Sequence, residues 1–102
     1  MRIIIVGAGE VGTHLAKLLA KEHIDITLMD EDPERLRDLD ANYDLMTRIG
    51  SPTSINDLKE AGSNIADLFI AVTPLESVNM TACMIATNLG AKKTLARIDN
   101  PE

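Results

Sequence analysis

Short apolar runs alternate with segments of helical periodicity along the whole chain. The runs predict strands at about residues 2–6, 24–30, 44–49, 67–72 and 93–98. The segments between them predict helices at about residues 10–21, from 32 onward with Leu36 and Leu39 inside, 51–61 and 75–89. This alternation indicates an α/β fold: a doubly wound parallel sheet, strand order 3-2-1-4-5, with helices on both faces. A sixth strand or a linker is expected to begin at about residues 99–102.

Two of the predicted helices carry apolar stripes that indicate their inward faces. In the helix at 10–21 the stripe consists of Val11, Leu15, Leu18 and Leu19. In the helix at 75–89 we expect Val78, Ala82, Ile85 and Leu89 to pack on the sheet, and Met80, Cys83 and Met84 to point outward. No charged residue occurs from 77 to 91, which is unusual for an exposed helix. We therefore expect this methionine-rich outer face to be buried in a homo-oligomer.

A glycine motif joins the first predicted strand to the first predicted helix. Its residues are Gly7, Ala8, Gly9, Glu10, Val11 and Gly12, which gives G-x-G-x-x-G spacing. The first glycine of such a motif permits a tight turn, the second lets a pyrophosphate approach the backbone, and the third lets the helix pack closely on the strand. The amides at the N-terminus of the helix would face the phosphates. The motif alone is weak, but a strand before it and a helix after it favour a nucleotide site.

Asp30 strengthens that interpretation because it ends the second predicted strand, 18 residues beyond Gly12. A carboxylate at this place in a βαβ unit accepts hydrogen bonds from the adenosine ribose hydroxyls. It would repel a 2′-phosphate, so NAD is favoured over NADP. The next helix is predicted to begin with Asp32 as N-cap and Pro33 at its first position. Arg35 lies one turn in, within reach of an adenine or a ribose, but it is expected to be a surface residue.

Three further strand ends contribute candidate cleft residues. After the third strand, Gly50 would let an adenine lie close to the backbone, and Ser51 follows it or simply starts the next helix. After the fourth strand, Thr73 is expected to face the glycine motif at the point where the sheet winding reverses. Thr73 and Pro74 also fit the start of a helix, and both roles are compatible. Near the end of the fifth strand, Arg97 would reach the pyrophosphate or pair with a surface acid.

Composition excludes several classes of protein. With 102 residues the chain is one small domain, and 45% hydrophobic and 25% charged residues are ordinary for a globular protein. A formal net charge of −6 provides no basic surface for nucleic acid. The longest uncharged run is too short to be inserted in a membrane, and no signal peptide is evident. The single Cys83 fits a reducing cytoplasm, and no His, Cys or carboxylate cluster has the spacing of a metal site.

Taken together, these segments resemble a known family. The matching pieces are Ile3 to Gly12, Asp25 to Asp30, Glu60-Ala61-Gly62, Ala66-Asp67, Ala71-Val72-Thr73, Asn79-Met80 and Ala96-Arg97-Ile98. In this order they are similar to the N-terminal domain of TrkA-type potassium-uptake regulators, a Rossmann-like nucleotide-binding domain called RCK or KTN. The combination of Ala71-Val72-Thr73, an asparagine six residues later and Ala96-Arg97 is more specific than the glycine motif.

The resemblance implies a cytoplasmic regulatory subunit that binds NAD(H), or in some members ATP or ADP. Such subunits form dimers or rings on the inner face of the membrane, beneath an integral potassium channel or transporter, and nucleotide exchange gates the pore. By matched position, Gly7 to Gly12 would cradle the pyrophosphate, Asp30 the ribose, and Thr73 and Arg97 the other side. Many members have an acid where this chain has Ser51, so a dinucleotide and a mononucleotide both remain open. Members usually carry a second domain, so the chain is a piece of a longer protein or a stand-alone subunit.

Two enzyme classes compete with a non-catalytic sensor. A cofactor domain of a truncated NAD-dependent oxidoreductase would share the fold, since this fold hosts many chemistries. Such an enzyme would usually show a catalytic acid or base near the ends of strands four to six, where this chain offers Thr73, Asn79 and Arg97. A methyltransferase that uses S-adenosylmethionine fits less well, because it needs a longer chain and usually a looser glycine spacing. The sequence therefore favours a sensor that is not an enzyme.

Overall fold

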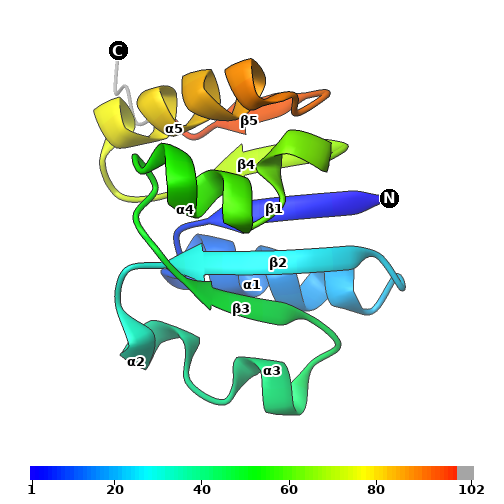
Figure 1. The fold of residues 1–102 in the computed structure, drawn as a ribbon. Helices are drawn as coiled ribbons and strands as arrows, with labels where there is room; N and C mark the ends of the chain where they lie inside the picture. Colours follow the sequence, from blue (N-terminus) through cyan, green and yellow to red (C-terminus); the bar gives the residue numbers. More distant parts are fainter. Residues whose placement is uncertain (99–102) are drawn as a thin grey trace.

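The computed structural model describes residues 1–98, which form a single sheet of five parallel strands (Figure 1). The strands are β1 (Arg2–Val6), β2 (Asp25–Asp30), β3 (Met46–Ile49), β4 (Leu68–Ala71) and β5 (Thr94–Ala96). Their order is β3-β2-β1-β4-β5, and Ile5 of the central strand lies opposite Leu28 on one side and Ile70 on the other. This confirms the predicted fold and strand order. The expected sixth strand or linker falls on residues 99–102, outside the described residues.

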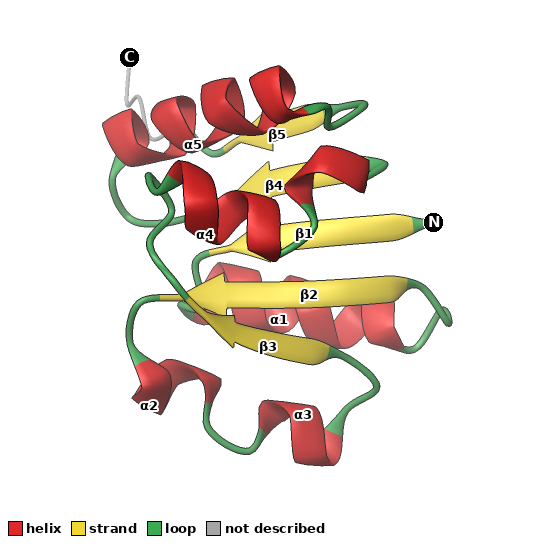
Figure 2. Cartoon of the chain, in the orientation of Figure 1, coloured by secondary structure: helices red, strands yellow, loops and turns green. Residues whose placement is uncertain are grey.

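Helices cover both faces of the sheet, and each face has its own apolar core (Figure 2). One face carries α1 (Glu10–Ala20), α2 (Pro33–Leu36) and α3 (Leu39–Asn42); the other carries α4 (Ile55–Glu60), the 3-10 helix η1 (Ser63–Ile65) and α5 (Glu76–Leu89). Successive residues of β1 supply the two cores in turn, because side chains along a strand alternate between faces. Within residues 1–98, no helix has the length and apolarity that crossing a bilayer requires.

The inward face of α1 is formed by smaller residues than the sequence predicted. Gly12, Ala16 and Ala20 are buried there, whereas Val11 and Leu18 are each 47% exposed, so those two positions of the predicted stripe are wrong. The reason is the closeness of the helix to β1: a Cβ on Gly12 would lie 1.7 Å from the carbonyl oxygen of Gly7. Only small residues fit between a helix and a strand at this separation, so the larger apolar side chains flank the contact.

α5 shows the same effect and corrects a second prediction. Its buried positions are Asn79, Ala82, Cys83 and Ala86, so Cys83 faces the sheet and not the outside. The Cys83 thiol donates to the carbonyl of Leu95 at 3.4 Å, and burial raises the pKa of this thiol above its ordinary value. Met80 and Met84 do point outward, at 51% and 65% exposed. The outward position of the two methionines is therefore confirmed, but this face also exposes polar residues and is not continuously apolar: Glu76, Ser77, Thr81, Thr87 and Asn88.

Two predicted helices differ in their extent. The single helix expected after Asp32 is two one-turn helices, because Asp38 adopts the left-handed conformation at φ 62° and interrupts the chain between α2 and α3. Asp32 is the N-cap as predicted, and its side chain accepts a hydrogen bond from the Glu34 amide. The helix expected from 51 begins only at Ile55, where Ser54 is the N-cap and accepts from the Asp57 amide.

Candidate functional site

A cleft of about 200 Å³ lies at the carboxyl ends of the central strands. It opens between β1 and β4, where the winding of the sheet reverses direction, which is the usual ligand position in open α/β sheets. The segments around it follow β1, β2, β3 and β4 and include the start of α5. Its lining consists of Val6, Gly7, Gly9, Asp30, Glu31, Arg35, Ser51, Pro52, Thr53, Thr73, Pro74, Leu75 and Val78.

Gly7 and Gly9 of the glycine motif line the cleft, and the space around each of them differs. Gly7 has φ 108°, and a Cβ there would lie 2.9 Å from the backbone nitrogen of Thr73. Gly9 is the N-cap of α1, and a Cβ on it would meet nothing within 4 Å. The first amides of α1 have no acceptor inside the helix, as at every helix N-terminus. The turn is held from below by the Thr13 hydroxyl, which donates to the Ala8 carbonyl at 3.1 Å.

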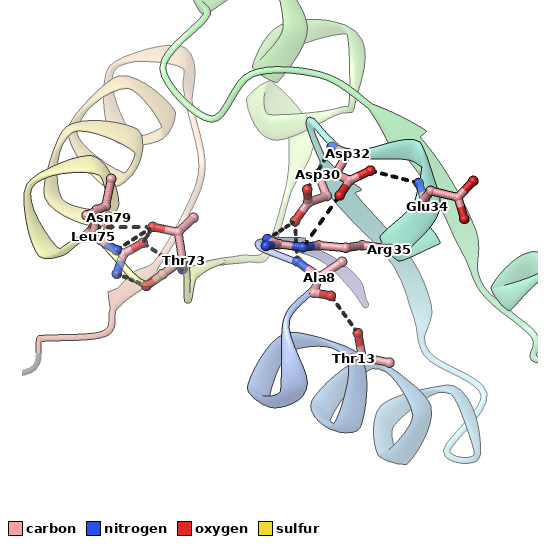
Figure 3. Close-up of polar contacts among 9 residues, drawn as sticks. All are labelled: Ala8, Thr13, Asp30, Asp32, Glu34, Arg35, Thr73, Leu75 and Asn79. Atoms are coloured by element: carbon pink, nitrogen blue, oxygen red, sulfur yellow. Dashed lines mark hydrogen bonds and ion pairs between the residues drawn. The ribbon is translucent and has the colours of Figure 1, made fainter. Parts of the chain in front are cut away.

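Asp30 stands at the end of β2 and closes one side of the cleft (Figure 3). Its Oδ2 accepts a 2.7 Å hydrogen bond from the Ala8 amide, and its Oδ1 accepts a 2.8 Å hydrogen bond from the Asp32 amide. The residue is only 8% exposed. Because each carboxylate oxygen can accept two hydrogen bonds, Oδ1 keeps a position for a further donor such as a ribose hydroxyl, whereas Oδ2 also faces the guanidinium of Arg35 at 3.7 Å. Asp30 therefore both ties the β1 and β2 loops together and presents acceptor capacity to the cleft.

Arg35 is an exposed residue, as expected, and it also lines the cleft. Its Nη1 lies 3.7 Å from Oδ2 of Asp30, and its Nε lies 3.9 Å from Oδ2 of Asp32 (Figure 3). The side chain is 50% exposed, so one side of the guanidinium meets solvent. It is the only cationic side chain among the cleft-lining residues that the structure describes. Beside it stand the carboxylates of Asp30 and Glu31, so this end of the cleft is acidic on balance.

The opposite wall is formed by the segment between β4 and α5. The Thr73 hydroxyl accepts a 3.3 Å hydrogen bond from the Leu75 amide and donates a 2.7 Å hydrogen bond to Oδ1 of Asn79. α5 itself begins at Glu76, with Leu75 as N-cap, so the prediction that Thr73 and Pro74 start this helix is wrong. Thr73 and Pro74 instead line the cleft ahead of the helix. The backbone contact between Gly7 and Thr73 places this wall directly against the glycine motif.

The structure brings half of the predicted site residues to the cleft. Those that line it are Gly7, Gly9, Asp30, Ser51, Thr73 and Pro74. Those that do not are Ala8, Glu10, Val11, Gly12, Gly50 and Arg97. Gly50 has a packing reason of its own, because a Cβ there would lie 3.0 Å from the Met29 sulfur and 3.1 Å from Cβ of Asp57. Arg97 is held by its backbone, whose amide donates to the Ala71 carbonyl at 2.9 Å.

Several cleft residues escaped the sequence analysis. Glu31, Pro52, Thr53, Leu75 and Val78 line the cleft next to predicted residues. A signal for the first three was present, since residues that follow a parallel strand at its carboxyl end lie at the ligand edge. Val78 was assigned to the sheet-packing stripe, and its partial exposure arises where the first turn of α5 overhangs the cleft. Nowhere in residues 1–98 do three or more His, Cys, Asp or Glu side chains group as a metal site would require.

Comparison of the sequence with known proteins finds a family match. The model of the TrkA-N domain family matches residues 3–102. The Trk system potassium uptake protein TrkA of Haemophilus influenzae is 46% identical over 103 residues, covering 100% of this chain and 22% of the relative. The chain thus spans about a fifth of the length of that relative.

Solved structures share the fold at low sequence identity. The NAD(P)-binding domain of an exopolyphosphatase-related protein from Archaeoglobus fulgidus has a TM-score of 0.83 at 14% identity, covering 98% of this chain and 74% of the other. The AMP-bound C-terminal domain of Kef from Shewanella denitrificans has a TM-score of 0.77 at 18% identity, covering 93% and 57%. The family match across nearly the whole chain and the identity to a TrkA protein lead to one conclusion: this chain belongs to the TrkA-N domain family.

Proposed function

We propose that this domain binds an adenine nucleotide, NAD(H) foremost, and serves as the non-catalytic sensor of a potassium uptake system. Its relative from Haemophilus influenzae is named a Trk system potassium uptake protein. One structural neighbour is described as an NAD(P)-binding domain and another is bound to AMP. The cleft at the winding reversal of the sheet is where such a ligand fits this fold.

The observation that carries the proposal is the position of Asp30 beside the glycine motif. Its Oδ1 accepts one hydrogen bond, from the Asp32 amide, and keeps a second acceptor position in the cleft that Gly9 also lines. A ribose at Asp30 would put the attached phosphate at Gly9, against the unpaired amides and the positive dipole end of α1. The second half of a dinucleotide would then extend toward Thr73 and Pro74. Each part of the ligand therefore meets a group of matching chemistry.

The charges at the ribose end favour NAD(H) over its 2′-phosphorylated form. Asp30, Glu31 and Asp32 are consecutive acids there, and Arg35 is the cation that lies beside them, 3.7 Å from Asp30 and 3.9 Å from Asp32. A 2′-phosphate would bring a further negative charge to a place where carboxylates outnumber the guanidinium. ATP and ADP are the alternative ligands, because they carry the same adenosine ribose and phosphate groups and lack a 2′-phosphate.

The sensor role rests on the chemistry that the cleft offers. Its ionisable side chains within the described residues are Asp30, Glu31 and Arg35, and two of these already bind each other. Binding, not bond making, is what this set supports. We further propose that the protein acts as a homo-oligomer, a dimer or a ring, through the outer face of α5 with Met80 and Met84. Its site of action would be the cytoplasm, at the inner face of the membrane, on an integral potassium channel or transporter subunit.

Calorimetric titration of the domain with NADH, NADPH and ATP tests the ligand. We expect NADH to bind more tightly than NADPH, and Asp30→Ala to weaken NADH binding by about 10- to 100-fold, the loss of one or two charge-assisted hydrogen bonds. The matched control is Asp25→Ala, which removes an acid from the opposite end of β2, where Asp25 pairs with Arg2 at 3.6 Å. Preference for ATP would move the sensor from redox state to energy state. Binding of none of the three would refute the proposal.

A further inference from the structure

Asn79 is a polar side chain in the middle of the buried face of α5. It is 1% exposed and lies among positions otherwise occupied by alanine and cysteine. A buried polar group in an apolar face is costly unless its hydrogen bonds are made. The sequence marked this asparagine only as part of a family resemblance, and the proposed ligand contacts leave it unused.

All four hydrogen-bonding positions of the Asn79 amide are occupied. Oδ1 accepts from the Thr73 amide at 2.8 Å and from the Thr73 hydroxyl at 2.7 Å (Figure 3). Nδ2 donates to the carbonyl of Thr73 at 3.0 Å and to the carbonyl of Arg97 at 3.0 Å. A side-chain amide offers two donors and two acceptor positions, so this network is complete. Its orientation is fixed by the backbone partners, because an amide N–H must meet the oxygen and carbonyls must meet the nitrogen.

The partners of Asn79 belong to two separate parts of the fold. Thr73 is in the wall of the cleft, against Gly7, and three of the four bonds hold it. Arg97 follows β5, and its amide donates to the Ala71 carbonyl at 2.9 Å. One side chain from α5 therefore joins the cleft wall after β4 to the end of the outermost strand.

We propose that Asn79 is a positioning residue: it fixes Thr73 in the cleft wall relative to the end of β5 at Arg97. The nucleotide then meets a preformed wall, and the backbone after β5 is held by the same amide. Binding is stronger when a site is already ordered, because the ligand does not have to order it. This proposal rests on the proposed nucleotide site for its effect on affinity, but its effect on β5 is independent of any ligand.

The first test needs no ligand. Amide hydrogen exchange is compared between the wild type, Asn79→Ala and Ala86→Gly, a control that weakens the same buried helix face two turns further along. We expect the Arg97 amide to exchange about tenfold faster in Asn79→Ala, relative to the Leu58 amide in α4, because local opening at the end of β5 becomes easier. In Ala86→Gly the ratio of the two rates should remain that of the wild type. An unchanged ratio in Asn79→Ala would show that Asn79 does not position β5.

The second test is the affinity for NADH at a temperature where all variants are folded. We expect Asn79→Ala to weaken binding by about fivefold to tenfold, the equivalent of about one hydrogen bond, and Ala86→Gly to leave it unchanged. Equal affinity in both variants would mean that Asn79 only stabilises the fold, which refutes its role in the cleft. If the wild type binds no NADH, the proposed ligand fails, while the exchange experiment still decides whether Asn79 holds the end of β5.

Discussion

Asp30→Ala should destabilise the fold as well as remove a ligand contact. The carboxylate is 8% exposed and accepts hydrogen bonds from the Ala8 amide at 2.7 Å and the Asp32 amide at 2.8 Å. A hydrogen bond to a charged group contributes about 1.5–3 kcal/mol. The Ala8 bond is buried and should count nearly in full, whereas water can replace part of the Asp32 bond. We therefore expect a loss of about 3 kcal/mol in the free energy of unfolding.

That loss is a large fraction of the stability of a small domain, which is about 5–15 kcal/mol. Urea unfolding followed by far-ultraviolet circular dichroism measures it directly, and the midpoint should fall without a change in slope. Glu31→Ala is the matched control, because it removes a neighbouring acid that lines the same cleft. Equal stability of the two variants, to within about 0.5 kcal/mol, would refute the reasoning that Asp30 ties the two loops together. Asp30→Asn keeps an acceptor and should lose about half as much.

Three further outcomes follow from the structure. Gly12→Ala should cost about 3 kcal/mol in urea unfolding, because its Cβ would lie 1.7 Å from a backbone oxygen, whereas Gly9→Ala should cost under about 1 kcal/mol and weaken NADH binding. In titrations, Arg35→Ala should weaken NADPH binding about fivefold more than NADH binding, because the only cation that lines the described cleft is lost; equal losses would contradict this. The hydrogen bond from the Arg2 amide lowers the pKa of Asp67 below its ordinary value of 3.8. This bond should therefore contribute stability above pH 3.8, and the contribution should be lost as the pH falls through the lower pKa of the folded state, which unfolding measured against pH can show. Asp67→Asn should flatten that loss and lower stability at neutral pH.

Strands and their order were predictable because a doubly wound sheet leaves a strong pattern. Each central strand is a continuous apolar run, and the glycine motif marks the first crossing from strand to helix. Gly7 and Gly12 could be interpreted in advance because their roles are steric and follow from the motif. Asp30 could be placed in advance because the end of β2 always reaches the same edge of the sheet.

Helix orientation was less predictable, and for one physical reason. Hydrophobic periodicity selects the largest apolar side chains, but close packing on the sheet selects the smallest residues. Val11 and Leu18 of α1 were therefore expected inside and lie half exposed, while Ala16 is buried. On α5, Cys83 is buried for the same reason. Asn79 is buried there as well, because all of its polar groups form hydrogen bonds.

The interruption between α2 and α3 and the ion pairs of Arg35 could not be predicted from the sequence. Asp38 interrupts the helix between α2 and α3 because it has φ 62°, and no motif in the sequence predicts this conformation. Arg35 lies in α2, before that interruption, and its side chain is 3.7 Å from Asp30 at the end of β2 and 3.9 Å from the N-cap Asp32. Such pairings depend on side-chain conformations, and periodicity carries no information about them.

A crystal structure of the domain grown with NADH tests the central claim most directly. We expect ribose hydroxyls within hydrogen-bond distance of the Asp30 carboxylate, phosphate oxygens at the Gly9 end of α1, and the remainder of the ligand beside Thr73. A nucleotide bound elsewhere, for example on the outer surface of α1, or a ribose that leaves the Asp30 carboxylate uncontacted, would contradict it.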